Sequence, residues 1–497
     1  MGVKYIRSRN LLIAVLCLLT AFSGCFGTLT WADGSFENVA DGGAQTSQMQ
    51  FEEFAEDVMA LTDKYEPDET AADEFQTMRL IVEASYPVQD ERAVEIAGGY
   101  EGLYILQYET AEAAREAYET FQGKDGISAV QPDRILDVND TTEQIEQKSY
   151  LAWGAGSTGL DSFMTFLMTE CESLPEITVA VLDTGIDSSV SMFSDRICAD
   201  GRNYVSSRKR FNTSDDNGHG TMVSSVIVDN TTDNVKLLPI KVMNKNGEGY
   251  DSRILLGMAY ALDYGADIIN MSIGGDGEIS IYESIMKRAA QQSVPVIVAA
   301  GNESADVMTS TPANIESAIT VSSVDSEGNL SSFSNYGATV DFAAPGQDII
   351  VIGMGGRRYN VSGTSFATPY VSASYALIMS ADSELSATDI YELLTASAKD
   401  LGTPGWDGEY GYGELNLLGM EARFKGEQND PAGVTAGDVD GDNSVTSVDA
   451  YYILCFLTGR REPDDKQWMS SDVDGDGEVT VLDVWYILKQ ETTAYYS

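Results

Sequence analysis

The amino-acid sequence predicts an α/β protein with a doubly wound, mainly parallel sheet, preceded by a small α+β unit and followed by an all-α module of loop–helix repeats. Three observations lead to this prediction. Strands and helices alternate between residues 150 and 425. Strands and a helix are also compressed into residues 78–138. Finally, the acidic motif Asp438–Asp442 recurs at Asp472–Asp476, and each copy leads into an apolar helix.

The N-terminus has the pattern of an export signal, predicted over residues 1–25. A basic start precedes the apolar run Leu11–Phe22, which is too short to span a membrane comfortably. Ala21-Phe22-Ser23 fits a cleavage site, whereas the segment ending at Cys25 resembles a lipoprotein box. Cys25 is therefore either a lipid anchor or a residue removed with the signal. In both cases we expect the chain to be secreted, and in the first case attached to the cell surface.

Residues 26–77 are polar and acidic, and are predicted to form a linker or a loosely folded lead-in. The pattern then changes to that of a small α+β unit, expected over residues 78–147. Its expected elements are strands at Arg79–Val82, Leu103–Leu106 and Ile127–Ile135 and a helix capped by Thr110 and ending at Phe121.

Residues 148–424 contain the apolar, β-branched runs that buried parallel strands require. These runs are Ile177–Leu182, Val235–Met243, Asp267–Ser272, Val294–Ala300 and Ala318–Val324. Helical segments lie between them, such as Arg253–Tyr264, which Gly265 ends. In open parallel sheets, functional side chains gather at the carboxyl ends of the strands.

The charge and the cysteines exclude some classes of protein. The chain has 30 Lys and Arg against 78 Asp and Glu, a net charge of −48, so nucleic-acid binding is not expected. So acidic a chain suits calcium, although solubility alone also explains it. After the signal, Cys171, Cys198 and Cys455 remain, and their spacing implies neither a disulfide framework nor a metal cluster. A Cys171–Cys198 bridge is left open.

The middle domain carries the residues needed to cut a peptide bond. His219 is the one histidine in the chain, so a Ser–His mechanism has no other base. Asp183 ends a predicted strand, where it can orient an imidazole. Ser365 opens a helix whose first N–H groups can face an oxyanion. Asn302 ends a further strand and presents an amide to the same oxyanion.

These residues lie in segments that resemble the subtilisin-like serine peptidase family. The matching segments are Val181–Asp187, Gly218–Val223, Asn270–Gly275, Ala299–Asn302 and Gly363–Pro369, in the order found in the family. The resemblance implies a secreted endopeptidase with Ser365 as nucleophile, His219 as general base and acid, and Asp183 as orienting carboxylate. Asn302 and the Ser365 N–H would form the oxyanion hole.

The same resemblance implies a set of residues that bind the protein or peptide substrate and no cofactor for the catalytic chemistry. The substrate-binding residues are Ser272, Ile273, Gly274, Ala300 and Gly301. Residues 78–147 resemble the inhibitory propeptide of the family, and self-cleavage is expected within Asp137–Leu151, at a bond that the sequence does not fix. Asn230–Asn234 is too short for the calcium loop of many members. The short Asn302–Ile315 segment leaves side-chain preference open.

After a linker at 425–434, residues 435–497 contain two acidic loops with calcium-ligand spacing. The expected ligands are Asp438, Asp440, Asp442, Ser444 and Asp449 in the first loop and Asp472, Asp474, Asp476, Glu478 and Asp483 in the second. The last ligand of each loop is Asp, and one helix follows each loop. This resembles a dockerin, which binds a cohesin on a scaffold protein, as in a cellulosome. Ser447-Val448 and Val481-Leu482 resemble its partner-recognition points.

The main interpretation is an exported peptidase docked to an extracellular scaffold. One alternative is a catalytically silent, peptidase-fold binding subunit of that scaffold. Another is a calcium-sensing regulator. The complete set of Asp183, His219, Ser365 and Asn302 favours the enzyme.

Overall fold

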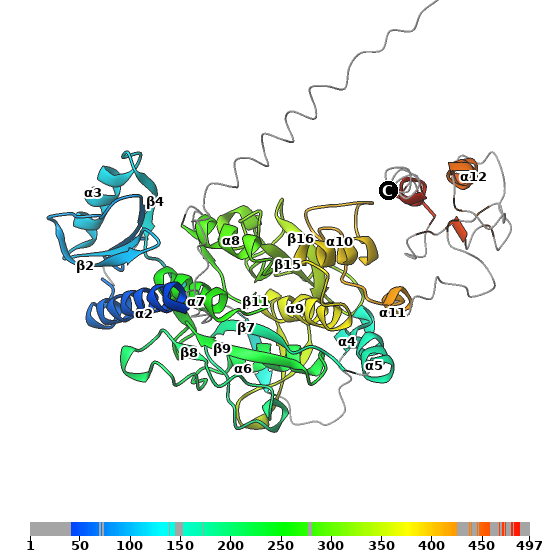
Figure 1. Cartoon of the computed structure of the whole chain (residues 1–497), viewed down its shortest axis with the longest axis horizontal. Coiled ribbons are helices and arrows are strands. Elements are labelled where there is room, and N and C mark those ends of the chain that lie inside the picture. The colour runs from blue at the N-terminus through cyan, green and yellow to red at the C-terminus, as the bar shows by residue number, and fades with distance from the viewer. Residues whose placement is uncertain are drawn as a thin grey trace, which may run out of the picture. The chain divides into compact units, whose positions relative to one another are not determined.

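The computed structural model describes residues 41–68, 71, 74–138, 140–144, 153–171, 173–276 and 281–424, together with parts of the segment 437–487 (Figure 1). The predicted signal, Cys25 and the linker at 425–434 lie outside the described residues. None of the helices in the described ranges has the length and apolarity to cross a membrane. Cys171 and Cys198 are both free thiols, so the bridge between them that the sequence left open is not formed.

Part of the acidic lead-in is a helix, α2 (Asp41–Lys64), so the prediction of a linker or loosely folded segment was wrong there. From Phe51 onward α2 buries apolar side chains at helical spacing. These are Phe51, Phe54, Ala55, Val58 and Leu61. On its polar side, Glu52 and Glu56 pair with Arg210. The acidic residues between the apolar ones make the segment polar in overall composition, and the prediction of a linker was based on that composition.

The small α+β unit has the antiparallel strand order β2-β3-β1-β4. Its elements are β1 (Arg79–Ala84), β2 (Ala93–Tyr100), β3 (Leu103–Tyr108), α3 (Ala111–Phe121) and β4 (Ile127–Pro132). The Thr110 side chain accepts a hydrogen bond from the Ala113 N–H and caps α3, as expected. Strand β2 was not predicted, because its apolar residues are interrupted by Glu95, Gly98 and Gly99.

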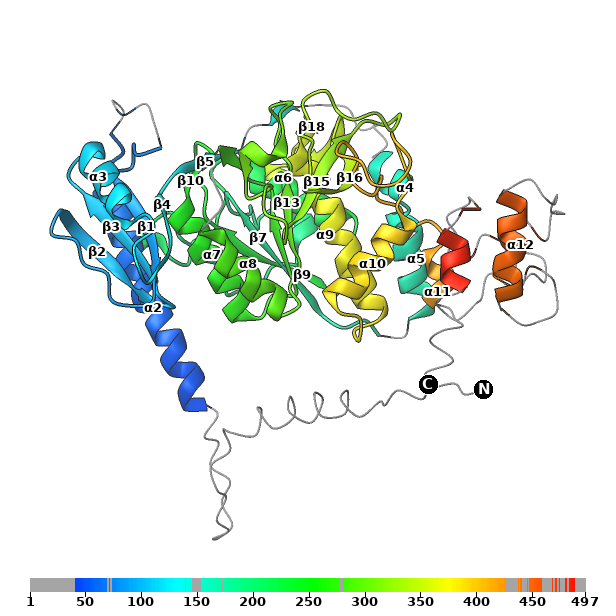
Figure 2. The same ribbon diagram turned by 90° about the horizontal axis from the view of Figure 1, so that it is seen from above.

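The central sheet has seven parallel strands in the order β16-β15-β13-β11-β7-β9-β8 (Figure 2). They are β7 (Ile177–Asp183), β8 (Arg202–Asn203), β9 (Val235–Lys241), β11 (Ile268–Met271), β13 (Val296–Ala299), β15 (Ile319–Val324) and β16 (Val340–Pro345). Each of the five apolar runs forms one of these strands. The predicted doubly wound α/β fold is confirmed.

Helices cover both faces of this sheet, because successive side chains of a strand point to opposite faces. In β7, Ala180 and Leu182 join a core with α7 (Asp251–Tyr264) and α8 (Tyr282–Gln291), which lie side by side in Figure 2. Val179 and Val181 join a second core with α6 (His219–Asp229) and α9 (Thr364–Ala381). The two cores fix the sheet between its helices.

Shorter strands and further α-helices connect these elements. They are β5 (Ile135–Asp137), β6 (Thr141–Gln144), α4 (Trp153–Thr158), α5 (Leu160–Glu170), β10 (Glu248–Tyr250), β12 (Gly275–Asp276), β14 (Ser310–Thr311), β17 (Ile349–Ile352), β18 (Arg358–Ser362), α10 (Ala387–Ser397), α11 (Met420–Phe424) and α12 (Ser447–Leu457). In the C-terminal module, Ile453 and Phe456 of α12 pack with Val484 and Ile487 in a small separate core.

A buried polar network joins the α+β unit to the start of α7. Arg79 pairs with Asp133 at 2.7 Å, and neither side chain is exposed. Asp133 also accepts hydrogen bonds from the backbone N–H and the hydroxyl of Ser252, both at 2.9 Å. Arg134 pairs with Asp251 at 2.7 Å. Each member of this network is needed for stability, because removing one partner leaves the other charge buried and uncompensated.

We therefore expect Asp133→Ala to destabilise the folded chain by about 3–5 kcal/mol, because Arg79 would lose its counter-charge. Urea unfolding of the full chain, with Ser365→Ala to prevent self-cleavage, measures this. Asp125→Ala, on an exposed turn of the same unit, serves as the control and should change stability by no more than about 0.5 kcal/mol. Equal effects of the two substitutions would contradict the role of the network.

Candidate active site

The structure brings Asp183 and His219 together at the carboxyl edge of the sheet. Asp183 ends β7 and His219 begins α6. The imidazole Nδ1 lies 2.8 Å from Asp183 Oδ1 and 2.9 Å from Asp183 Oδ2. Both side chains are buried. This contact fixes the plane of the ring and turns Nε2 away from β7.

Two carboxylates hold the His219 imidazole, Asp183 at Nδ1 and Asp140 at Nε2, and this arrangement favours the protonated ring. Burial alone would lower its pKa, but the attraction of Asp183 and hydrogen bonds to Asp140 and Asp183 outweigh burial and raise the pKa to about 10. A ring that already carries a proton on Nε2 cannot accept one from a nucleophile.

Ser365 lies in the first turn of α9, directly after Gly363 and Thr364. Its hydroxyl donates to the Ser272 carbonyl oxygen at 3.3 Å. The Ser272 hydroxyl in turn donates to the Ser365 carbonyl oxygen at 2.8 Å. Among the described hydrogen bonds, none joins Ser365 to His219. The structure thus forms the Asp–His half of the predicted triad and holds the Ser hydroxyl in a different contact.

Asn302 is oriented by Thr364. Its Oδ1 accepts hydrogen bonds from the Thr364 N–H at 2.8 Å and from the Thr364 hydroxyl at 3.0 Å. The Nδ2 group therefore points into the space in front of α9, where it donates to Asp140 Oδ1 at 3.0 Å. The chain reaches this position through Gly301, whose φ of +106° is left-handed and suits glycine.

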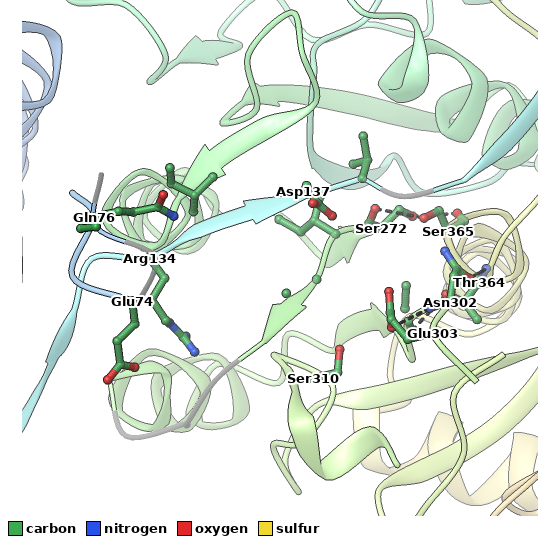
Figure 3. Close-up of a pocket in the computed structure, with 18 residues that line it drawn as sticks. Glu74, Gln76, Arg134, Asp137, Ser272, Asn302, Glu303, Ser310, Thr364 and Ser365 are labelled. Carbon is green, nitrogen blue, oxygen red and sulfur yellow. Dashed lines mark hydrogen bonds between the residues drawn. The ribbon is translucent and has the colours of Figure 1, made fainter. Parts of the chain in front are cut away.

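A cleft of about 680 Å³ opens beside Ser365. Figure 3 shows Ser272, Ser365, Thr364 and Asn302 gathered at one end of it. The predicted substrate-binding residues Ser272, Ile273, Gly274 and Gly301 all line it. Ala300 does not line it, in contrast to the prediction. Ala300 is buried, and its N–H donates to the carbonyl oxygen of Val321 in β15.

A segment of the chain itself runs through the site. The Asp137 N–H donates to the Gly274 carbonyl oxygen at 3.1 Å, and β5 pairs with β10 on its other edge. Beyond the site, Thr141 of β6 pairs with Ser362 of β18, three residues before Ser365. The backbone is thus paired before and after the point at which it passes the catalytic groups.

Sequence reasoning missed Asp140, which contacts both His219 and Asn302. Its one sequence signal is its place within the segment expected to be self-cleaved. Thr364 was also missed, although it lies beside Ser365 in the matching segment and orients Asn302.

The structure describes the last predicted ligand of each acidic loop. Asp449 and Asp483 are buried, and their Oδ1 atoms accept the N–H groups of Val439 and Val473, at 2.7 and 2.6 Å. Each carboxylate thus lies beside the start of its own loop. A buried carboxylate beside the start of a loop with an acidic sequence is suited to a divalent cation. The other eight predicted ligands, Asp438, Asp440, Asp442, Ser444, Asp472, Asp474, Asp476 and Glu478, lie outside the described residues.

Comparison with known proteins finds matches for the middle domain and for the C-terminal module. The model of the Subtilase family matches residues 175–413, and that of the Dockerin type I domain matches residues 436–490. Subtilisin DY of Bacillus licheniformis is 35% identical over 252 residues, which are 48% of this chain and 89% of that protein. A solved lanthipeptide protease is 26% identical with a TM-score of 0.50, covering 55% of this chain and 93% of that one.

A longer relative, the cell wall-associated protease of Bacillus subtilis (strain 168), is 32% identical over 278 residues, which are 49% of this chain. This chain spans only 31% of the length of that protein. The match to subtilisin DY, in contrast, covers most of the relative. Together with the fold and the position of Ser365, these matches show that the chain belongs to the subtilase family of serine proteases and ends in a type I dockerin domain.

Proposed function

We propose that this chain is an exported subtilisin-like endopeptidase that cuts protein or peptide substrates while its dockerin holds it on a cohesin-bearing scaffold. One observation carries the enzymatic part. The Ser365 hydroxyl at the start of α9 and the Asn302 amide line one end of the cleft, and Asp140 joins that amide to the buried Asp183–His219 pair.

In the reaction, the Ser365 Oγ attacks the carbonyl carbon of the substrate and forms an ester as the C–N bond breaks. The proton of Oγ moves to His219 Nε2 and then to the departing amine. Water attacks the ester next, gives one proton through His219 back to Ser365 Oγ, and leaves its oxygen on the acid. Asp183 keeps the ring oriented throughout, and one water is consumed for each bond cut.

The negative oxygen formed at each attack needs fixed donors. Asn302 Nδ2 is one, because Thr364 fixes the amide. The Ser365 N–H is the other, since first-turn N–H groups have no partner within their helix. This chemistry needs no cofactor. The backbone of Gly274 offers the substrate the same pairing that Asp137 makes with it.

Residues 78–147 act as an inhibitory propeptide in this proposal. The support is that the backbone of this segment pairs with Gly274 at Asp137 and with Ser362 at Thr141, two residues on opposite sides of the catalytic groups. The pairing of Asp137 with Gly274 and of Thr141 with Ser362 narrows the expected self-cleavage to the stretch bounded by Val138 and Thr141.

The dockerin would hold two calcium ions through the ten ligands predicted above. Calcium supplies the positive charge that lets the acidic loops fold. Asp449 and Asp483 support this, since each reaches back to its own loop. Leu482, at one predicted recognition point, is 54% exposed and thus available to a cohesin.

A catalytically silent binding subunit is the second candidate. The observation in its favour is that His219 Nε2 and Asn302 Nδ2 are both occupied by Asp140. The two candidates differ in whether the matured protein has a reactive serine.

We expect a fluorophosphonate probe to label the matured protein at Ser365, because an activated serine hydroxyl attacks such probes. Ser365→Ala should abolish labelling and lower peptide hydrolysis by several orders of magnitude, about 10⁶-fold in the related subtilisin. Ser326→Ala, at an exposed position, should keep both. A matured, folded protein that takes up no probe would favour the silent subunit.

Asn302→Ala should lower kcat by about 10²–10³-fold, the cost of removing one oxyanion donor in subtilisin, with KM little changed. The reason is that the donor acts on charge that exists only during the reaction. Steady-state kinetics of the matured enzyme on a peptide substrate measure this, with Gln292→Ala on an exposed surface as control. A rise in KM at constant kcat would assign Asn302 to substrate binding instead.

Removal of calcium should unfold the dockerin, because clustered carboxylates repel each other without the cation. Circular dichroism of the full chain should lose helical signal on chelation and regain it with added calcium. Calorimetry should find two calcium ions, and none once Asp449→Ala and Asp483→Ala are combined. Glu384→Ala, exposed on the peptidase domain, should leave calcium binding unchanged. Persistence of binding in the double variant would refute the ligand assignment.

A further inference from the structure

One carboxylate occupies both groups that the proposed reaction needs. Asp140 Oδ2 lies 2.7 Å from His219 Nε2, and Asp140 Oδ1 accepts the Asn302 Nδ2–H at 3.0 Å. The Asp140 side chain is only 3% exposed. The base and an oxyanion donor are thus both engaged by a residue that is close to neither in sequence.

The backbone holds this carboxylate in place. On one side, the Val138 N–H donates to the Gly247 carbonyl oxygen at 3.1 Å. On the other side, Thr141 pairs with Ser362. Gly363, the next residue, allows the close approach, since a side chain there would collide with the Asp140 carboxylate. Asp140 is therefore positioned by pairing on both sides.

The His219 imidazole and the Asn302 amide both present hydrogen-bond donors to the Asp140 carboxylate. The charged groups facing the ring are Asp183 at Nδ1 and Asp140 at Nε2. Two carboxylates around one buried ring favour its protonated form. The Asn302 amide then meets a negative oxygen, as it would in the reaction. The Ser365 hydroxyl, meanwhile, donates to Ser272 and not to the ring.

We propose that Asp140 is an internal inhibitor of the catalytic centre. Its carboxylate takes the place of the reaction's oxyanion at Asn302 and holds His219 protonated until the segment that carries it leaves. This inference rests on the proposed function, because only a working catalytic centre needs inhibition. The Asp140 side chain acts here only through its contacts with His219 and Asn302, and it transfers no proton in the reaction.

The direct test uses the single histidine of the chain, which gives one imidazole signal in a protein free of a His tag. Full-length chain with Ser365→Ala, labelled in histidine with ¹⁵N, is titrated by NMR. We expect a pKa far above the usual value near 6.5. Adding Asp140→Asn, which keeps the shape but removes the charge, should lower it by more than about one unit. Asp125→Asn, on an exposed turn of the α+β unit, should leave the pKa high.

The kinetic test follows self-cleavage of the chain with intact Ser365 by mass spectrometry. With Asp140→Asn we expect cleavage to be faster by at least about 10-fold at neutral pH, because each unit by which the histidine pKa falls raises the neutral fraction of the imidazole about tenfold. Asp125→Asn, on an exposed turn away from the cleft, should cleave at the original rate. An unchanged histidine pKa in the Asp140→Asn chain, or an equal fall with Asp125→Asn, would overturn the proposal.

The two tests separate this inference from the proposed function. A silent peptidase fold would still show the Asp140-dependent pKa, yet its matured form would take up no fluorophosphonate. In that case the proposed function fails and the contact stands, but not as an inhibitor. A reactive enzyme with a histidine that is insensitive to Asp140 keeps the proposed function and loses this inference.

Discussion

The hydrogen bond between Asp183 and the His219 imidazole is the contact on which the rest of the site depends. It requires β7 to lie inside a parallel sheet, so that its carboxyl end meets the start of α6. The same sheet edge receives Asn302 after β13 and Ser365 at the start of α9. Residues far apart in the chain therefore meet because parallel strands all end on one side.

Much of this arrangement follows from local sequence. Buried parallel strands must be apolar on both faces, so runs such as Ile177–Leu182 are visible without a structure. Polar residues that end such runs, Asp183 and Asn302 among them, are then placed at the edge. The capping of α3 by Thr110 was equally local.

The rest depended on contacts distant in sequence. The contact of Asp140 with His219 spans 79 residues, and that with Asn302 spans 162. No periodicity encodes them, because they follow from how β5 and β6 pair with distant strands. Helix α2 was missed for another reason: the acidic composition of the segment was weighed above the helical spacing of its apolar residues, which pack into the main core. Ala300 was misplaced because a residue can adjoin a cleft in sequence and still face the sheet.

The Asp133 carboxylate accepts hydrogen bonds from both the N–H and the hydroxyl of Ser252. It therefore caps the first turn of α7 from outside that helix. In the proposed self-cleavage, this cap would become a contact between two molecules, and its occupancy would depend on their concentrations. A protease in a large volume would then lose its cleaved propeptide by dilution. A protease held beside others on a scaffold, as proposed above, would rebind propeptides released nearby and stay inhibited for longer.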